Sequence, residues 1–184
     1  MKTDWNWDKL DPLERRVAEF LVQGKSNATI CTEVFLSRAR VQECIKRILI
    51  KTGADSTRGA IALLVQERET LTLLSVLEQA RDGVAIVQDR VVTFANRALQ
   101  EVLGYDAEEI IGMPFVELVA ARSRNAALKQ HELRLRGAPF STLYVIGALC
   151  KGGREKDVVV ANAGQILYRG EPAVLTAVIP HVAE

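Results

Sequence analysis

The chain has 184 residues, enough for one domain or two small ones. Hydrophobic residues make up 48% of the sequence, which excludes a disordered protein, and no apolar run approaches the roughly 18 residues of a membrane span. The formal net charge is only +1, but between residues 37 and 58 six basic side chains stand against two acidic ones, so an anionic partner is expected to meet that segment.

The first residues contain no apolar stretch of the kind that a secretory signal needs. Cys31, Cys44 and Cys150 are too widely spaced for a metal site or a disulfide framework. We therefore expect a cytoplasmic protein whose cysteines are small core residues. The sequence also lacks a nucleophile–base constellation and a phosphate-binding loop, so we do not expect an enzyme.

Four helices are expected in residues 1–67. Asp11, Pro12 and Glu14 form a capping-box pattern at the start of the first helix, which ends at Gly24. Ser26, Ser37 and Ser56 can cap the other three. Apolar residues recur at helical spacing and are expected to face one core: Leu13, Val17, Phe20, Leu21, Ile30, Val34, Val41, Ile45, Ile48, Leu49, Ile61, Leu64 and Val65.

The second and third of these helices form a helix-turn-helix pattern. Both are short, a tight turn at Leu36 and Ser37 joins them, and the third helix is basic. At 100° per residue the face of the third helix opposite its apolar side carries Ala39, Gln42, Glu43, Lys46, Arg47 and Ile50. Such a face suits the major groove of DNA. Periodicity alone fits a solvated face of a structural helix equally well.

Residues 10–60 resemble the LuxR-type DNA-binding domain. The resemblance rests on Glu14, Val17, Leu21, Gly24, Lys25, Ser26, Asn27, Ile30, Leu36, Ser37, Val41, Ile45, Ile48, Lys51, Gly53 and Ala60. It implies a four-helix domain that binds DNA and dimerises through its fourth helix. The chain departs from the family at Arg40, Gln42 and Cys44, where Thr, Lys and His are usual, so the family's usual target sequence is not expected.

The resemblance and the chemistry of base edges together give a set of candidate DNA contacts. Gln42 suits adenine, Glu43 can accept a hydrogen bond from cytosine, and Lys46 suits guanine. The candidate contacts to phosphate are Lys25, Asn27, Ser37, Arg40, Arg47 and Lys51. Arg38, which stands beside Ser37, is a further candidate DNA contact.

Residues 68–80 are expected to form a helical linker. No Pro interrupts residues 57–80, so this segment is either one long helix or the fourth helix followed by a separate one. Leu64, Leu71, Leu74 and Leu77 fit either a coiled coil, which Arg68 interrupts, or an amphipathic helix that packs on a sheet or on a partner chain. Both alternatives join the two domains by a stiff connection.

Residues 81–184 are expected to form an α+β domain with a five-stranded antiparallel sheet. A hairpin over 83–95 turns at residues 88–90. Two short helices follow and then a longer one, from Ala121 to Arg136. Three further strands are expected at about 140–150, 156–168 and 172–181, and since these are apolar on both faces, both faces of the sheet are expected to be covered.

This order and several local motifs resemble the PAS fold. The motifs are residues 82–87, Phe94-Ala95-Asn96-Arg97-Ala98, residues 103–115 and the turn at residues 151–155. PAS domains sense varied signals or pair with one another, so the resemblance implies a sensor or dimerisation domain without naming a ligand. A small-molecule ligand would lie between the long helix and the sheet, against Leu128, Tyr144, Ile146, Val160, Asn162 and Val178. A filled core without a ligand is the alternative.

No cofactor is predicted. The cysteine motif of flavin-binding PAS domains is missing. His131 lies on the long helix, as the haem ligand does in haem-binding PAS domains, but it stands less than two turns before Gly137, where that ligand stands about three. We therefore expect neither flavin nor haem and expect His131 to be an ordinary surface side chain.

The sequence thus predicts a transcription regulator in which a PAS domain senses a signal or mediates dimerisation and a LuxR-type helix-turn-helix binds operator DNA. The expected partners are double-stranded DNA and a second copy of the chain, paired through the fourth helix, the linker helix and the PAS sheet, without a membrane. The alternative is a protein-interaction module whose helix-turn-helix no longer reads DNA and whose PAS domain docks a partner.

Overall fold

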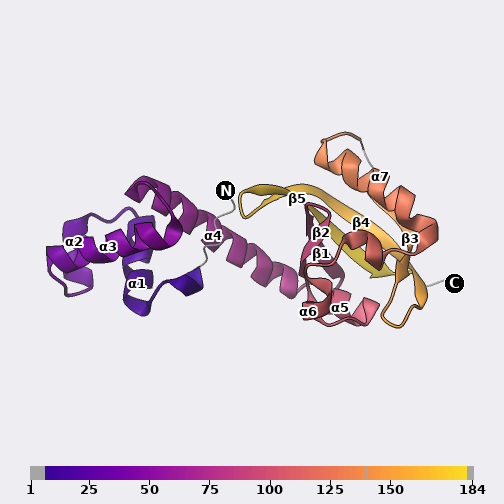
Figure 1. The fold of residues 1–184 in the computed structure, drawn as a ribbon, viewed down its shortest axis with the longest axis horizontal. Helices are drawn as coiled ribbons and strands as arrows, with labels where there is room; N and C mark the ends of the chain where they lie inside the picture. Colours follow the sequence, from indigo (N-terminus) through magenta and orange to yellow (C-terminus); the bar gives the residue numbers. More distant parts are fainter. Residues whose placement is uncertain (1–6, 140, 182–184) are drawn as a thin grey trace. The chain divides into compact units, whose positions relative to one another are not determined.

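A computed structural model of the chain describes residues 7–139 and 141–181 (Figure 1). Its elements are η1 (Trp7–Lys9), α1 (Pro12–Val22), α2 (Asn27–Glu33), α3 (Arg38–Thr52), α4 (Thr57–Glu78), β1 (Gly83–Gln88), β2 (Val91–Ala95), α5 (Arg97–Leu103), α6 (Ala107–Ile110), η2 (Phe115–Leu118), η3 (Ala121–Ser123), α7 (Arg124–Leu135), β3 (Leu143–Leu149), β4 (Glu155–Tyr168) and β5 (Glu171–Pro180). The expected fold class, an N-terminal helical region followed by an α+β domain with an antiparallel sheet, is confirmed. None of the described helices has the length and apolar character needed to cross a lipid bilayer.

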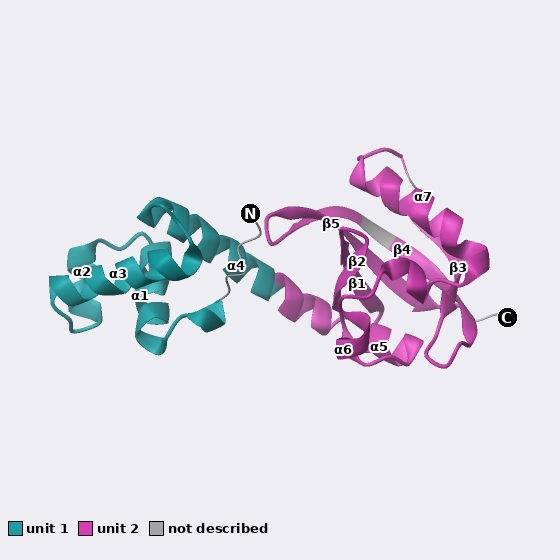
Figure 2. Ribbon diagram, in the orientation of Figure 1, with its two compact units in different colours: residues 1–72 teal, residues 73–184 magenta. Residues whose placement is uncertain are grey.

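The chain divides into two compact units, residues 1–72 and 73–184 (Figure 2). The division falls within α4, which is a single helix from Thr57 to Glu78. Residues 68–80, the expected helical linker, are therefore the last part of α4 and the two residues that follow it. Each unit has its own hydrophobic core and is described by itself below.

The core of the first unit lies between α1, α2, α3 and the first turns of α4. Val17, Ile30, Val41, Ile48 and Leu64 are completely buried there. All five occupy the inward positions that the helical spacing predicts. Burying each such side chain contributes on the order of 1.5–3 kcal/mol, so this core accounts for the fold of the short helices around it.

A buried carboxylate joins the start of α1 to the end of α3. The predicted capping box is present, since the Asp11 side chain accepts from the Glu14 amide and the Glu14 side chain accepts from the Asp11 amide, both at 2.8 Å. The amide of Glu14, with Arg47 nearby, lowers the pKa of Asp11. Glu14 itself is completely buried and pairs with Lys51 Nζ at 2.6 Å and with Arg47 Nε at 3.3 Å.

The second unit is built on an antiparallel sheet with the strand order β2-β1-β5-β4-β3. Helices α5, α6 and α7 and the turn η2 belong to the core on one face, the inner face. The last turns of α4 cover part of the other face, where Leu74 and Leu77 pack against Ile86, Tyr168 and Ala173. On β3, however, Leu143 and Val145 are more than half exposed. Within one chain the helical linker thus covers only part of the outer face, where the sequence predicts cover by the linker, by a second chain, or by both.

Asn96 ties three parts of the second unit together. As predicted, it caps α5, and its Oδ1 accepts from the Leu99 amide at 3.0 Å and also from the Val84 amide at 2.7 Å. Its Nδ2 donates to the carbonyl oxygens of Leu77 at 3.1 Å and Asp82 at 3.0 Å. The side chain is completely buried, so it joins the end of α4 to β1 and α5 through satisfied hydrogen bonds.

One expected element is wrong in its boundaries. The sequence predicts one helix from Ala121 to Arg136, but the chain forms the short turn η3 first, and α7 begins only at Arg124. The cause is a tertiary contact with β3: the Ala120 amide donates to the Gly147 carbonyl at 2.8 Å, and the Gly147 amide donates to Ser123 Oγ at 3.0 Å. These bonds hold residues 120–123 against the strand and delay the start of the helix.

Candidate functional sites

The turn between α2 and α3 orients the outward face of α3. Ser26 caps α2 and Ser37 caps α3, as the sequence predicts. Between them Phe35 adopts a positive φ of 54°, which turns the chain back within a few residues. Since Val41, Cys44, Ile45 and Ile48 hold the inner side of α3 in the core, its other side is left at the surface.

Eight of the ten candidate DNA contacts are exposed and form no ion pair with a described residue: Lys25, Asn27, Ser37, Arg38, Arg40, Gln42, Glu43 and Lys46. Five of them, from Arg38 to Lys46, follow one another along the first three turns of α3. Arg47 and Lys51 differ from these eight, because both pair with Glu14 and so serve the core of the unit. The surface that the structure leaves for a ligand is therefore shorter than the sequence suggests and lies toward the N-terminal end of α3.

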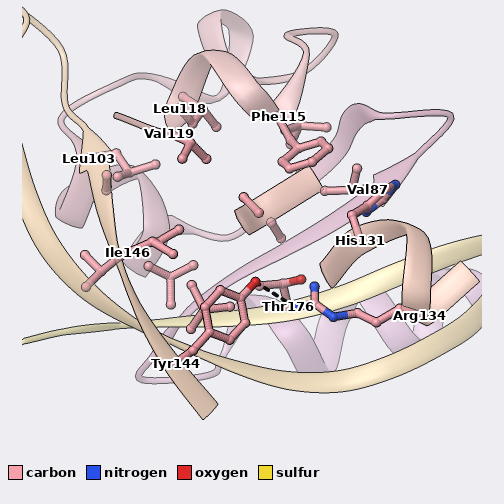
Figure 3. Close-up of a pocket in the computed structure, with 17 residues that line it drawn as sticks. Val87, Leu103, Phe115, Leu118, Val119, His131, Arg134, Tyr144, Ile146 and Thr176 are labelled. Carbon is pink, nitrogen blue, oxygen red and sulfur yellow. Dashed lines mark hydrogen bonds between the residues drawn. The ribbon is translucent and has the colours of Figure 1, made fainter. Parts of the chain in front are cut away.

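The second candidate site is a cavity of about 90 Å³ inside the second unit, between the inner sheet face, α7 and η2 (Figure 3). Its walls are mainly apolar, and the described residues that line it are Ala85, Val87, Val92, Leu103, Phe115, Leu118, Val119, Ala127, His131, Arg134, Tyr144, Ile146, Ala148, Val158, Val160, Thr176 and Val178. Strand register explains which side chains reach it. Tyr144 pairs with Val160, Val160 pairs with Val178, and Ile146 pairs with Val158, so these residues point to the same face.

The structure brings four of the six candidate pocket residues into this cavity: Tyr144, Ile146, Val160 and Val178. Leu128 does not line it, since the helical phase of α7 places Ala127 there instead. Asn162 lies in β4 opposite Thr176, and its side chain lies outside the described part of the structure. Side chains of a strand alternate between its two faces, and the candidate residues of β3, β4 and β5 that line the cavity lie on the inner face, as the sequence predicts. Only the candidate on α7, Leu128, is replaced by a neighbouring residue.

His131 is the main correction to the sequence analysis. The sequence led us to expect a surface side chain, but His131 is 3% exposed and lines the cavity. Its ring centroid lies 4.8 Å from that of Phe115, and its Nε2 atom is buried without a hydrogen-bond partner among the described residues. Burial, followed by the nearby charges of Arg134 and Arg90, lowers the pKa of His131 from 6.5 to about 4, against a small opposing effect of Glu132. The imidazole is therefore neutral near pH 7.

Arg134 is the second residue that sequence reasoning missed. It is 4% exposed, and its Nη2 donates to the Tyr144 hydroxyl at 2.7 Å (Figure 3). Ala127, His131 and Arg134 stand four and three residues apart, which places them on one face of α7. That spacing was available in the sequence, but a histidine and an arginine are not the residues that a core-facing helix normally offers.

The remaining titratable residues give no further site. No group of three or more His, Cys, Asp or Glu side chains could hold a metal ion among the residues that the structure describes. Cys44 and Cys150 are buried thiols and Cys31 is half-buried, as expected for small core residues. The two sites are thus the outward face of α3 and the cavity of the second unit.

A five-stranded antiparallel sheet with helices packed on one face around a cavity defines an α+β domain with an internal pocket. Residues 73–162 match the family model of the PAS fold, and this part of the chain is a PAS domain, a sensor or signalling module. The PAS resemblance of the sequence is thereby confirmed. The N-terminal helices are assigned to no family, so their likeness to LuxR-type domains stays a prediction. The sequence matches none of the curated proteins with which it was compared.

Solved structures of PAS domains are similar to the second unit at low sequence identity. The PAS domain of a protein from Desulfitobacterium hafniense is 17% identical, with a TM-score of 0.48 over 58% of this chain and 99% of its own. The PAS domain of an HTR-like protein from Haloarcula marismortui is 19% identical, with a TM-score of 0.46 over 62% and 93%. A variant of RsLOV is 12% identical, with a TM-score of 0.51 over 64% and 70%. At such identities the likeness concerns the fold alone.

Proposed function

We propose that the chain is a DNA-binding transcription regulator in which α2 and α3 form a LuxR-type helix-turn-helix and the PAS domain supplies the signal-dependent input. The observation that carries this proposal is the outward face of α3. Arg38, Arg40, Gln42, Glu43 and Lys46 are exposed on a helix whose opposite side is fixed in the core. A rigid helix that presents donors, acceptors and positive charge outward has the properties of a major-groove reader.

Fluorescence anisotropy with mixed genomic duplex DNA at several salt concentrations tests the proposal. The informative variant is Arg40→Ala/Lys46→Ala, because neither side chain pairs with a described residue. Arg47 and Lys51 are unsuitable, since removing either would strip a partner from the buried Glu14. The matched control is Lys129→Ala/Arg136→Ala, which removes two exposed positive charges from the PAS domain.

The affinity of the wild type is expected to fall linearly with the logarithm of the salt concentration. The double variant should bind at least about tenfold more weakly, with the salt slope reduced by about 1 for each lost phosphate contact, while the control binds like the wild type. Salt-independent binding, or equal binding by variant and wild type, would refute the assignment of α3 to DNA.

The surface formed by α3 and the turn before it also supports a second candidate, a protein-interaction module. Phe35 and Ile50 are 90% and 72% exposed, and large exposed apolar side chains favour a protein partner over a phosphate backbone. A Phe35→Ser/Ile50→Ser variant separates the two functions. DNA binding unchanged by this variant favours the regulator, whereas a wild type that does not bind duplex even at low salt favours the interaction module.

We further propose that the chain acts as a homodimer. Leu71 and Val76 on α4 and Leu143 and Val145 on β3 are large apolar side chains that this chain leaves exposed. A second copy that covers α4 and the outer side of the PAS sheet would bury them and would supply two helix-turn-helix units for a twofold operator. Light scattering after size exclusion tests this, and Val145→Lys is expected to shift the mass toward the monomer.

A further inference from the structure

The cavity of the PAS domain has one polar side. Of the described residues that line it, four carry polar or charged side-chain atoms, and none is an Asp or a Glu: His131, Arg134, Tyr144 and Thr176. His131 and Arg134 are adjacent on one face of α7, and Arg134 is bonded to the Tyr144 hydroxyl. In Figure 3 these side chains lie away from Leu103, Leu118 and Val119, which belong to the apolar part of the wall.

Two of these polar groups, the Tyr144 hydroxyl and the His131 imidazole, have hydrogen-bonding capacity left for a ligand. The Tyr144 hydroxyl accepts a hydrogen bond from Arg134 at 2.7 Å, so its own proton remains to be donated. The His131 Nε2 atom is buried and has no hydrogen-bond partner among the described residues, which costs about 1–3 kcal/mol when nothing compensates. An incoming polar group at this point would relieve that cost.

The charge of the cavity selects the sign of the ligand. Arg134 is a buried guanidinium, and guanidinium groups keep their charge in proteins. A cation would be repelled by it. A ligand that is polar all round would leave its other polar groups against Val87, Val160 and Val178 without hydrogen bonds. The wall therefore fits a molecule with a single anionic end and an apolar body.

We propose that the PAS cavity binds a small monocarboxylic acid, with the carboxylate held by Arg134 and Tyr144 beside His131 and the apolar body against the valine and leucine side chains. A planar carboxylate matches the geometry of a guanidinium better than a point charge does. An apolar cavity of roughly 150 Å³ can hold benzene, so a cavity of about 90 Å³ is too small for an aromatic ring and fits a short branched chain. The assignment deepens the sensor role proposed above by naming its ligand class.

Isovalerate and isobutyrate are suitable probes, with isoamyl alcohol and isobutyl alcohol as neutral counterparts of similar shape. Binding to the full chain is followed by calorimetry and by the imidazole Cε1–H resonances, of which there are two because the chain has two histidines. The acids should shift the His131 resonance, leave that of the exposed His181 in place, and bind at least about tenfold more tightly than the alcohols, as expected for a charge-assisted hydrogen bond. Equal binding of acids and alcohols, or an unmoved His131 resonance at millimolar acid, overturns the proposal.

Two variants test the residues. Arg134→Met keeps an unbranched apolar stem without the guanidinium and should reduce the preference for acid over alcohol at least about tenfold, whereas Tyr144→Phe should reduce it about three- to tenfold. Arg136→Met is the control, because Arg136 is exposed and does not line the cavity. If Arg134→Met does not fold, Tyr144→Phe and the wild-type comparison decide. An unchanged preference in Tyr144→Phe overturns the proposed carboxylate position.

The ligand-binding measurements are made without DNA, so they are independent of the test of DNA binding. A chain that binds isovalerate but no duplex would retain the ligand assignment and lose the proposed DNA-binding function. A chain that binds duplex but none of the acids would do the opposite.

Discussion

Lowering the pH from about 7.5 to about 4.5 is expected to destabilise the PAS domain through His131. The folded domain holds this imidazole neutral, because burial and the charges of Arg134 and Arg90 lower its pKa to about 4, whereas in the unfolded chain the value returns to 6.5. Above 6.5 neither state binds the proton, so this group contributes no pH dependence there. As the pH falls below 6.5 the unfolded chain binds the proton first, and stability decreases until the pH reaches about 4.

The size of the effect follows from the two pKa values. Each pKa difference of one corresponds to about 1.36 kcal/mol, so the loss is on the order of 3 kcal/mol below pH 4 and about 2–3 kcal/mol at pH 4.5. A single domain is usually stable by only about 5–15 kcal/mol, so this fraction is measurable.

Urea unfolding at the two pH values measures the loss. Trp7 packs against the core of the first unit, and the only other tryptophan in the sequence is Trp5, so tryptophan fluorescence is used to follow that unit, while circular dichroism reports both. The remaining dichroism transition belongs to the PAS domain. His131→Leu should remove about 2–3 kcal/mol of the pH dependence of this transition, while His181→Asn, at an exposed position, should leave it unchanged. An unaltered pH dependence in His131→Leu would show that His131 is not held neutral and would refute the reasoning.

Three further substitutions test contacts within the two units. Glu14→Ala removes both the capping bond and the buried ion pairs. It should lower the free energy of unfolding of the first unit by about 3 kcal/mol, measured by tryptophan fluorescence in urea. Glu14→Gln should cost less, because it keeps an amide oxygen for the cap. Asn96→Asp places a carboxylate oxygen against the backbone carbonyls that now accept from the amide. It should destabilise the PAS domain by about 2 kcal/mol or more, at least as much as Asn96→Ala. A urea midpoint of the dichroism transition that does not shift would contradict this. Gly147→Ala brings a methyl group to 2.9 Å from Ala120 Cβ and should lower the melting temperature of the PAS domain. The control is Gly59→Ala, at a helical position with room for a methyl group, which should not lower the melting temperature of the first unit.

The local structure of the chain follows from residues close in sequence. Capping side chains at Asp11, Ser26, Ser37 and Asn96 mark helix starts, and the structure has a helix beginning directly after each of them. These signals act through hydrogen bonds to amides two or three residues away, so they can be read without knowing the fold. The same holds for strand parity at Tyr144 and Val160, because side chains alternate along any extended strand.

The candidate sites were predictable only in part. The outward face of α3 could be derived because a helix with one apolar side has a defined opposite side. The pairing of Arg47 and Lys51 with Glu14 could not, since Glu14 is more than thirty residues away and the sequence offers it only as a capping residue. An ion pair between distant segments leaves no periodic signal.

By itself the sequence determined the order of helices and strands, the two-part organisation, the PAS resemblance of residues 82–155 and the polar side of α3, because each depends on propensity, spacing or a contiguous motif. The tertiary structure alone decided that α7 begins at Arg124, since β3 binds the residues before it. It likewise decided that His131 and Arg134 face a cavity beside Tyr144. Burial of polar side chains depends on which surfaces the fold brings together, and composition and periodicity do not contain that information.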